Sequence, residues 1–336
     1  MQQSSDLLSQ NALKELKNSK NLLAFSAGVD SSALFFLLLN NNIDFDIAIV
    51  DYQIRQSSKD EVAYAKELAK KYNKNFYYHQ CKIDGGNFEK KARDIRYGFF
   101  TDLIKRYHYQ NLITAHQLND KLEWFLMQMI KGAGLVELLG FDEIENRDFY
   151  KIIRPLIETS KESLLKFLDQ NSIKYFNDES NKSLKYKRNI IREKISNPLL
   201  REYEGGIRNS FRFLHNDKKY FMNNLNYVNF EELYIIKKDQ HYIRYVDKIL
   251  KKLGYVLSKK QRDEIERLDE LVISNRYVIS KQTGAILISP YSKVKMNKDF
   301  KDICRIHKIP SKIRPYIYEK GLDLNEIIKS IALFLH

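Results

Sequence analysis

The sequence is poor in the residues that staple or restrict a chain. It has two cysteines, Cys81 and Cys304, and only 5 prolines and 12 glycines among 336 residues. Two isolated cysteines exclude a disulfide framework and a cysteine-based zinc site. So little proline and glycine excludes collagen-like, proline-rich and linker-like chains. With 43% hydrophobic and 30% charged residues, the composition instead predicts buried cores, and the length predicts about two domains.

Long apolar runs are also absent. Residues 1–20 are polar and lack the hydrophobic run of a signal peptide. The longest apolar stretch, residues 33–39, is far shorter than the ~20 residues that span a bilayer. We therefore expect a soluble, cytoplasmic protein with no membrane partner.

The net charge is positive and unevenly distributed along the chain. The net charge is +14, yet residues 1–180 hold 24 basic and 25 acidic side chains, whereas residues 181–336 hold 33 and 18. The codon bias of an AT-rich genome would raise lysine throughout the chain, but the first part is balanced. The pattern favours a surface in the second part that faces a polyanion.

Residues 1–200 alternate short apolar strands with helices. The strands are expected at residues 21–25, 45–51, 75–80, 111–115 and 150–153. Helices are expected from Ser31 or Ser32, over residues 58–72, 88–107 and 119–130, and from a capping box of Thr159 and Glu162. This alternation predicts a parallel, Rossmann-like sheet covered on both faces, with its ligand site at the carboxyl ends of the strands.

The pattern changes near residue 200, where we place a domain boundary. Residues 205–227 and 241–270 read as mainly helical, and residues 277–280 and 285–289 as a hairpin around Gln282, Thr283 and Gly284. The prediction is a catalytic domain over residues 1–200, followed by a smaller, basic, mainly helical domain with a short hairpin over residues 201–336.

The segment from Ser26 to Ser31 (Ser-Ala-Gly-Val-Asp-Ser) lies between the first strand and its helix. Backbone N–H groups of such a turn form an anion cradle together with the helix N-terminus. Asp30 would repel a bare phosphate, so it implies a bound magnesium ion or a positioning role. Taken alone, the segment could equally be an ordinary helix cap.

This turn resembles the Ser-Gly-Gly-x-Asp-Ser pyrophosphate loop of the N-type ATP pyrophosphatases, the PP-loop superfamily. The resemblance implies an adenine nucleotide alpha hydrolase-like fold and cleavage of ATP between its α and β phosphates. Ala27 replaces a family glycine, and its Cβ would crowd the nucleotide or disfavour a positive φ. The ATP-binding residues so implied are Ser26, Ala27, Gly28, Val29, Asp30, Ser31 and Asp51.

Later segments are similar to those of the tRNA(Ile)-lysidine synthetases. Residues 50–55 match that family's Val-Asp-His-Gly-Leu-Arg at Asp51 and Arg55, and residues 114–123 match Thr-Ala-His-His-x-Asp-Asp-Gln-x-Glu, with Asn119 in place of the first aspartate. Residues 87–97, 131–140, 154–156, 178–181 and 186–192 follow in the family order. The tRNA or substrate contacts implied are Arg55, Glu89, Arg93, Arg96, Gly132, Gly134, Asn189 and Arg192.

The resemblance implies that ATP and magnesium adenylate the wobble cytidine of the CAU anticodon of tRNA(Ile), and that free L-lysine then displaces AMP. It also implies that the basic domain over residues 201–336 binds the tRNA backbone, with an affinity that falls as salt rises. The implied catalytic residues are Asp30, His116, Asp120 and Arg188, with Asp30 and Asp120 as magnesium ligands. Each of these side chains also has an ordinary structural interpretation, as a helix cap, packing residue or solvated helix face. Neither the lysine pocket nor the oligomeric state, a homodimer included, follows from the sequence.

We weighed three alternative functions. A tRNA thiolase would need reactive cysteines or an iron–sulfur site, which Cys81 and Cys304 do not provide. An amidating ligase such as NAD synthetase would not explain the basic second part. An RNA-binding protein with a decayed ATP site is compatible with Ala27, Tyr52 and Asn119, and ATP–pyrophosphate exchange would distinguish it.

Overall fold

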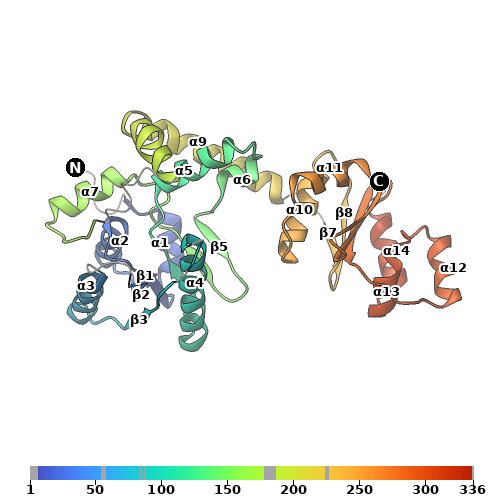
Figure 1. Cartoon of the computed structure of the whole chain (residues 1–336), viewed down its shortest axis with the longest axis horizontal. Helices are drawn as coiled ribbons and strands as arrows, with labels where there is room; N and C mark the ends of the chain where they lie inside the picture. Colours follow the sequence, from blue (N-terminus) through green and yellow to red (C-terminus); the bar gives the residue numbers. More distant parts are fainter. Residues whose placement is uncertain are drawn as a thin grey trace. The chain divides into compact units, whose positions relative to one another are not determined.

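The computed structural model describes residues 7–53, 58–83, 85–86, 88–177, 187–223 and 227–334. The chain forms two compact units, Met1–Lys218 and Lys219–His336, which are described separately (Figure 1). They divide inside one long helix, α9 (Asn197–Asn223), whereas the sequence pattern changes near residue 200, where this helix begins.

Unit 1 is built on a six-stranded sheet of order β3-β2-β1-β4-β6-β5. Its strands are β1 Asn21–Ala24, β2 Asp46–Asp51, β3 Phe76–Gln80, β4 Asn111–Ile113, β5 Ile144–Asn146 and β6 Lys151–Ile153. All neighbours pair in parallel except β5, which is antiparallel to β6. The predicted parallel sheet is therefore confirmed. The added edge strand β5 has only three residues, too few to show a periodic pattern.

Alternating strand residues divide the core of unit 1 between the two faces of the sheet. Leu23, Ile113 and Ile153 point to the face covered by α1, α2, α3 and α7. Leu22 and Leu112 point to the opposite face, which α4 covers. The helices of unit 1 are α1 Gln10–Leu16, α2 Val29–Asn40, α3 Ser58–Lys71, α4 Phe88–Tyr107, α5 Leu118–Met129, α6 Leu135–Leu139, α7 Lys161–Gln170, α8 Lys187–Ile191, the π-helical turn η3 Arg192–Ser196, and α9.

Two helix starts in unit 1 differ from expectation. Helix α2 begins at Val29 rather than at Ser31 or Ser32, because Gly28 is its N-cap. Helix α7 is capped by Ser160, whose hydroxyl accepts a hydrogen bond from the Ser163 N–H, so the predicted Thr159 cap is wrong. Thr159 instead donates its hydroxyl to the carbonyl of Leu7, at 2.6 Å. The polar N-terminal segment gave no helical signal for α1.

Unit 2 is a five-stranded antiparallel sheet of order β7-β8-β11-β10-β9. Its strands are β7 Tyr227–Phe230, β8 Leu233–Lys237, β9 Glu270–Ile273, β10 Tyr277–Lys281 and β11 Ala285–Pro290. The predicted hairpin is confirmed as β10–β11, but the sequence analysis missed the other three strands. These are short and lie between or at the ends of the predicted helices.

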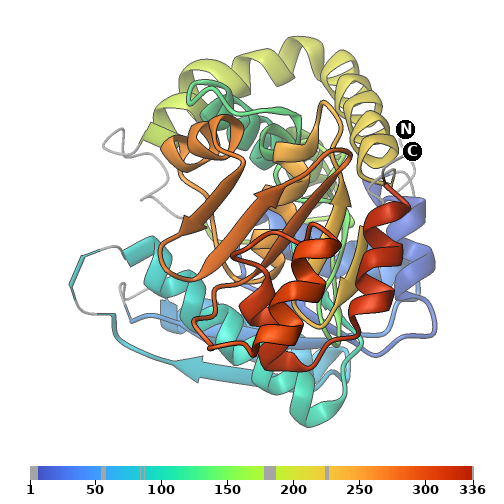
Figure 2. The ribbon, with the colours of Figure 1, turned by 90° about the vertical axis from the view of Figure 1, so that its right-hand side faces the viewer.

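Helices cover both faces of this second sheet. They are α10 Tyr242–Lys252, α11 Lys259–Arg267, α12 Lys298–Ile306, α13 Arg314–Lys320 and α14 Leu324–Ala332. Helices α10 and α11 pack on one face, and α12, α13 and α14 on the other (Figure 2). None of the described helices is both long and apolar enough to cross a membrane.

Candidate active site

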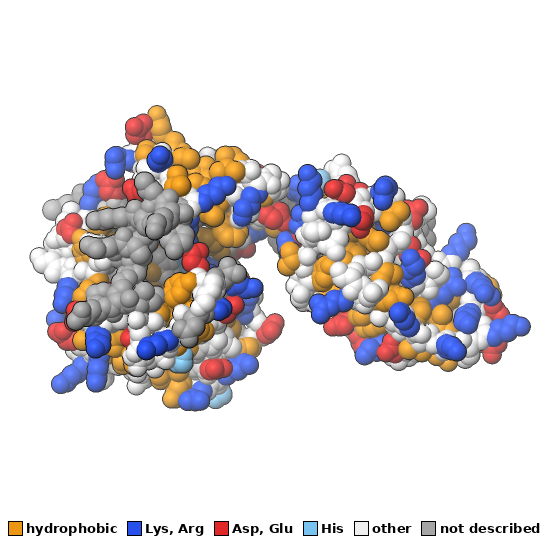
Figure 3. All heavy atoms as spheres, in the orientation of Figure 1, with side chains coloured by type: hydrophobic (Ala, Val, Ile, Leu, Met, Phe, Trp, Pro, Cys, Tyr) orange, Lys and Arg blue, Asp and Glu red, His pale blue; other side chains and the backbone are white. Residues whose placement is uncertain are grey.

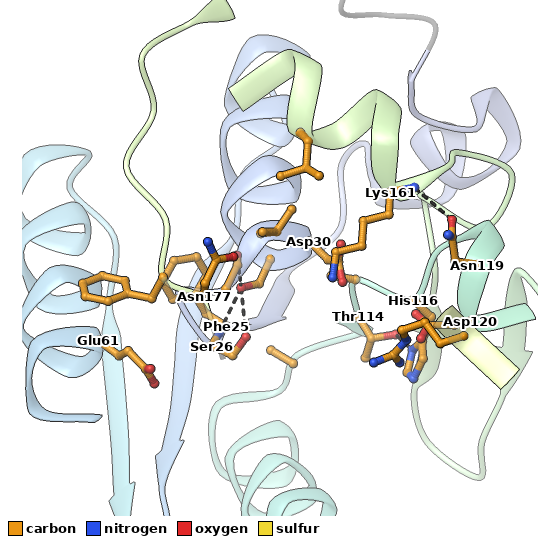
Figure 4. Close-up of a pocket in the computed structure, with 18 of the residues that line it drawn as sticks. Phe25, Ser26, Asp30, Glu61, Thr114, His116, Asn119, Asp120, Lys161 and Asn177 are labelled. Atoms are coloured by element: carbon orange, nitrogen blue, oxygen red, sulfur yellow. Dashed lines mark hydrogen bonds between the residues drawn. The ribbon is translucent and has the colours of Figure 1, made fainter. Parts of the chain in front are cut away.

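A pocket of about 1180 Å³ opens at the carboxyl edge of the parallel sheet in unit 1 (Figure 4). The segments that follow β1, β2 and β4 form one side of it, and α7, α8, η3 and the start of α9 form the other. Parallel strands direct their carboxyl ends, and the loops after them, to this same edge. Its volume exceeds the ~300–1,000 Å³ of ordinary ligand pockets, so it can hold more than a nucleotide.

Hydrogen bonds of two serines, Ser26 and Ser31, stabilise the loop after β1. The Ser31 hydroxyl accepts a hydrogen bond from the Ser26 N–H at 3.2 Å and donates to the Gly28 carbonyl at 3.2 Å. The Ser26 hydroxyl lies 3.1 Å from that of Ser31. These contacts hold the loop at the N-terminus of α2, where free N–H groups and the helix dipole favour a phosphate.

Ala27 adopts the left-handed conformation that a glycine would favour. Its φ is +57°, and its carbonyl accepts a hydrogen bond from the Phe176 N–H at 2.9 Å. A non-glycine residue in this region costs about 1–2 kcal/mol. The side chain is fully buried in the core and does not line the pocket. The methyl group therefore strains the backbone but does not crowd the nucleotide site.

Asp30 lies in the first turn of α2 with its Oδ1 atom buried. Within the part of the chain that the structure describes, this oxygen has no hydrogen-bond partner. The Lys161 side chain reaches toward it from the start of α7 (Figure 4). Burial raises the pKa of Asp30 to about 6, and the positive charge of Lys161 opposes that rise. A buried carboxylate oxygen without a partner, beside an anion cradle, fits a cation bound together with phosphate.

His116 follows β4 and is held neutral. Its Nδ1 lies 3.0 Å from the Thr114 hydroxyl, and its ring lies 5.1 Å from that of Phe141. Burial, and then the charge of Arg154, lower the pKa of His116 to about 3. A neutral imidazole can accept or relay a hydrogen bond, but it does not supply a positive charge to a phosphate.

Two arginines converge on a carboxylate that is almost completely buried. Glu123 of α5 accepts hydrogen bonds from Nε of Arg188 at 2.7 Å and from Nε of Arg192 at 2.6 Å. Arg188 also contacts Asp120 Oδ1 at 2.6 Å. The other oxygen of Asp120 accepts the Gln117 N–H at 3.2 Å and caps α5. The cluster fixes both guanidinium groups at the edge of the pocket. Arg192 lies in the π-helical turn η3, and such turns are frequent at functional sites.

Asn119, which replaces a family aspartate, connects three segments of the pocket. Its Oδ1 accepts the Lys161 N–H at 3.0 Å, and its Nδ2 donates to Asn197 Oδ1 at 3.1 Å. An aspartate could accept the first hydrogen bond but could not donate the second. The amide therefore joins α5 to the starts of α7 and α9.

The other predicted residues divide into three groups. Ser26, Gly28, Val29, Asp30, Ser31, Asp51, Arg96, His116, Asp120, Arg188 and Arg192 line the pocket together with Lys161. The residues not among those lining it are Ala27, Glu89, Arg93, Gly132, Gly134 and Asn189. Arg55, Asn87 and residues 178–186 lie outside the described residues.

The glycines after α5 have a structural function. Gly132 has a φ of +73°, in the turn after α5, and Gly134 is the N-cap of α6. Gly140 has a φ of +63°, and a Cβ there would overlap the Trp124 indole. Residues 131–140, which we predicted to be a substrate loop, thus form the connection around α6, and none of them lines the described pocket.

Sequence reasoning missed two functional candidates, Lys161 and Glu123. Lys161 follows the Arg154-Pro155-Leu156 segment and begins a helix, an unfavourable place for a cation because of the helix dipole. Glu123 lies in the family-like segment of residues 114–123, but its role depends on Arg188 and Arg192, which lie 65 and 69 positions later in the chain. The unusual position of Lys161 at a helix start could have been noticed in the sequence, whereas the contacts of Glu123 with the two arginines required the tertiary structure.

No group of three or more His, Cys, Asp or Glu side chains with metal-binding geometry occurs among the described residues. Cys81 is half-buried, and Cys304 is buried in the core of unit 2. Neither cysteine lines the pocket. The described pocket therefore contains no thiol for sulfur transfer or cluster ligation.

Comparison with known proteins agrees with this geometry. The family model of the PP-loop domain matches residues 1–199. The tRNA(Ile)-lysidine synthase of Helicobacter pylori is 44% identical over 313 residues, covering 92% of this chain and 93% of the relative. That of Campylobacter jejuni is 41% identical, covering 93% and 96%.

Among solved structures, the U34-tRNA thiolase NcsA from Methanococcus maripaludis matches with a TM-score of 0.52 and 18% identity, covering 63% of this chain and 76% of that one. At this identity the likeness concerns the fold alone. The family model and the near full-length relatives, in contrast, establish the family: the chain belongs to the PP-loop proteins and, among them, to the tRNA(Ile)-lysidine synthases.

Proposed function

We propose that this chain ligates lysine to C2 of the wobble cytidine in the CAU anticodon of tRNA(Ile), in the cytoplasm. The observation that carries the proposal is the pocket of unit 1, in which one edge of the sheet brings together a phosphate loop, a buried aspartate and two fixed arginines. The high coverage of the lysidine synthase relatives supports the same substrate class.

The first step activates the base. The C2 oxygen attacks the α-phosphorus of ATP, an O–P bond forms, and the bond to the departing pyrophosphate breaks. The loop after Ser26 and Lys161 both line the pocket, and their N–H groups and ammonium would stabilise the negative charge that develops on the leaving phosphates. Activation is needed because the C2 oxygen alone is a poor leaving group, whereas AMP is a good one.

Magnesium fits this site through Asp30. Magnesium is usually held by one or two carboxylates together with phosphate oxygens and water, so a three-carboxylate cluster is not required. Asp30 has a buried oxygen available, whereas both Asp120 oxygens already accept hydrogen bonds, from Arg188 and from the Gln117 N–H. We therefore assign the metal to Asp30, where it would neutralise phosphate charge, and give Asp120 the task of orienting Arg188.

The second step uses the part of the pocket nearer to α8 and η3. An amine of lysine attacks C2 and loses a proton, the C2–O bond breaks, and AMP leaves with that oxygen. Arg188 and Arg192 can face the phosphate of the adenylated intermediate, because Glu123 holds them from behind. Arg96 lines the same pocket from α4 and adds a third guanidinium group for phosphate or RNA.

The experiment uses purified full-length protein, ATP, magnesium and radiolabelled lysine. Unmodified tRNA(Ile) transcript with a CAU anticodon is compared with tRNA(Met) transcript. We expect incorporation into tRNA(Ile) alone and a loss of at least 100-fold in the Asp30→Ala variant. Asp44→Ala is the matched control, because Asp44 is exposed at the opposite edge of the sheet, before β2.

One result would contradict the role given to Asp30, and another would contradict the proposed activity itself. Incorporation that survives Asp30→Ala would remove the assigned role of the aspartate. An absence of both lysine incorporation and ATP–pyrophosphate exchange, despite binding of tRNA, would instead favour an RNA-binding protein with a decayed nucleotide site.

A further inference from the structure

Positive side chains are common on this protein, so a basic residue is informative only where its position is fixed. Lys and Arg side chains are scattered over both units on the face seen in Figure 3. In the pocket of unit 1, Arg188 and Arg192 are held by Glu123. Arg96 lines the same pocket but forms no ion pair with any described residue, so its position depends on how α4 itself is held.

The N-terminal part of α4, Phe88–Arg96, has few buried side chains. Ala92 is the only residue of this part of the helix that is buried, and the large core residues of α4 begin at Phe100. A helix end with so few buried apolar contacts has low local stability by itself. Side chains from outside α4 therefore decide how firmly this part of the helix is held beside the pocket.

Tyr52, in the loop after β2, makes such a contact. Its hydroxyl donates a hydrogen bond to the Ala92 carbonyl at 2.8 Å, and its ring lies 5.9 Å from that of Phe88, edge to face. In an α-helix the carbonyl of Ala92 also accepts the N–H of Arg96, so the hydroxyl is bonded to the turn that carries the guanidinium group. Burial raises the pKa of the Tyr52 hydroxyl, which therefore stays protonated and able to donate.

The backbone that carries Tyr52 is itself fixed. The buried carboxylate of Asp51 accepts the Gln53 N–H at 2.8 Å through one oxygen and the Tyr78 hydroxyl at 3.1 Å through the other. These bonds hold the residues on either side of Tyr52, so its hydroxyl reaches α4 from a rigid position. Tyr52, which by sequence alone was compatible with a decayed site, therefore has a defined partner in the fold.

We propose that Tyr52 is a positioning residue, which holds the guanidinium group of Arg96 at the pocket so that it binds a phosphate of ATP or of the tRNA. The inference rests on the proposed function of unit 1. Both side chains line the pocket, one from the loop after β2 and the other from α4. Phosphate is the anionic group that the two substrates share, and a guanidinium group binds it through two parallel hydrogen bonds.

The test is a double-mutant cycle of Tyr52→Phe and Arg96→Met in the full-length chain. Lysine incorporation gives kcat and the KM values for ATP and for tRNA(Ile) transcript, and equilibrium binding gives the Kd of each. Tyr52→Phe keeps the ring and removes one hydrogen bond, so it should raise one KM about 3- to 10-fold and leave kcat within about twofold. Arg96→Met should raise the same KM about 10- to 100-fold. The KM that rises identifies the substrate whose phosphate Arg96 binds.

The cycle separates positioning from a general contribution to stability. In the Arg96→Met background, Tyr52→Phe should change that KM by less than about twofold, because the group that it positions is gone. Tyr277→Phe is the matched control, since the Tyr277 hydroxyl donates to the Leu253 carbonyl at 2.7 Å in unit 2, and its loss should leave both KM values unchanged.

Effects that multiply in the double variant would overturn the proposal, since a tyrosine that only stabilises the fold acts independently of Arg96. So would wild-type KM values in Tyr52→Phe, whatever happens to kcat. A wild-type chain that incorporates no lysine would contradict the proposed function instead. In that case the same cycle, read in the Kd values for ATP and tRNA, still supports or overturns the role of Tyr52.

Discussion

At the scale of single residues, the pocket depends on side chains whose charge state is set by burial. Asp30 and His116 are shifted in opposite directions, each toward its neutral form. Lys161 supplies a cation close to the buried aspartate, from a helix start where a cation is otherwise unfavourable. Perturbed groups that gather in one cleft are typical of a catalytic site.

Lys161→Met should lower kcat/KM for ATP by about 100- to 1000-fold, because one preorganised cation on the leaving phosphates is lost. Lys161→Arg, which keeps the charge, should retain a substantial part of the activity. The measurement is ATP–pyrophosphate exchange in the presence of tRNA(Ile). A methionine variant with wild-type exchange would show that Lys161 only balances the charge of Asp30.

His116→Gln should change how stability depends on pH. The folded-state pKa of His116 is about 3, below its ordinary 6.5, so between these values the unfolded chain binds a proton that the folded chain does not. Stability from this group therefore falls as pH falls below 6.5. Asp30 acts in the opposite direction between about 6 and 3.8, because its folded-state pKa is raised.

The two effects largely offset each other in the wild type below pH 6, and removal of the histidine leaves the aspartate effect alone. From pH 7 to pH 5, we expect the free energy of unfolding of His116→Gln to rise relative to wild type by about 1–2 kcal/mol. Urea titrations at the two pH values measure this difference. An unchanged difference would mean that His116 titrates normally.

At the scale of elements, the pocket is closed by ion pairs between helices that are distant in sequence. Glu123 joins α5 to α8 and η3 through two arginines. On α9, Arg212 pairs with Glu158, and Lys218 lies 2.7 Å from Asp142. These contacts fasten the helices that follow the sheet onto the edge where the strands end.

Glu123→Gln should destabilise unit 1 by about 2–4 kcal/mol, because it leaves two guanidinium groups without a buried countercharge. The lysine incorporation rate should fall as well, as the arginines lose their fixed positions. Thermal or urea unfolding, read beside incorporation, measures both effects. Asp302→Asn is the control, since it breaks only the exposed pair with Arg305 and should cost less than about 1 kcal/mol. Equal costs for the two variants would contradict the buried clamp.

At the scale of the whole molecule, the chain consists of two units with separate cores. The cores around α2 and α4 belong to unit 1, and those on the two faces of the second sheet belong to unit 2. Because the candidate pocket is lined by unit 1 alone, a ligand bound there stabilises one core directly.

We therefore expect two thermal transitions, of which ATP with magnesium shifts only one. At a ligand concentration of 100 times Kd the stabilisation is about 2.7 kcal/mol, which raises the Tm of a unit of this size by about 5–10 °C. Differential scanning calorimetry resolves the transitions. One cooperative transition that moves as a whole would indicate that the units unfold together.

The sequence by itself determined the parallel sheet of unit 1, because period-two and helical patterns are local properties of the chain. It also placed the loop after Ser26, Asp30, His116 and Asp120 at the ends of strands, where the sheet brings them to one edge. The sequence also raised the question of a positive φ at Ala27, which its Cβ disfavours, but only the folded turn shows that the residue adopts it, at +57°.

Only the tertiary structure decided which of the candidate side chains meet. It brought Lys161 to Asp30 and placed Glu123 behind Arg188 and Arg192, contacts between segments that no local pattern relates. It also placed the predicted glycine loop around α6 and showed that the predicted hairpin belongs to a five-stranded sheet. Short strands and buried ion pairs are stabilised by partners that lie far away in the sequence. They could therefore not be predicted from local sequence patterns.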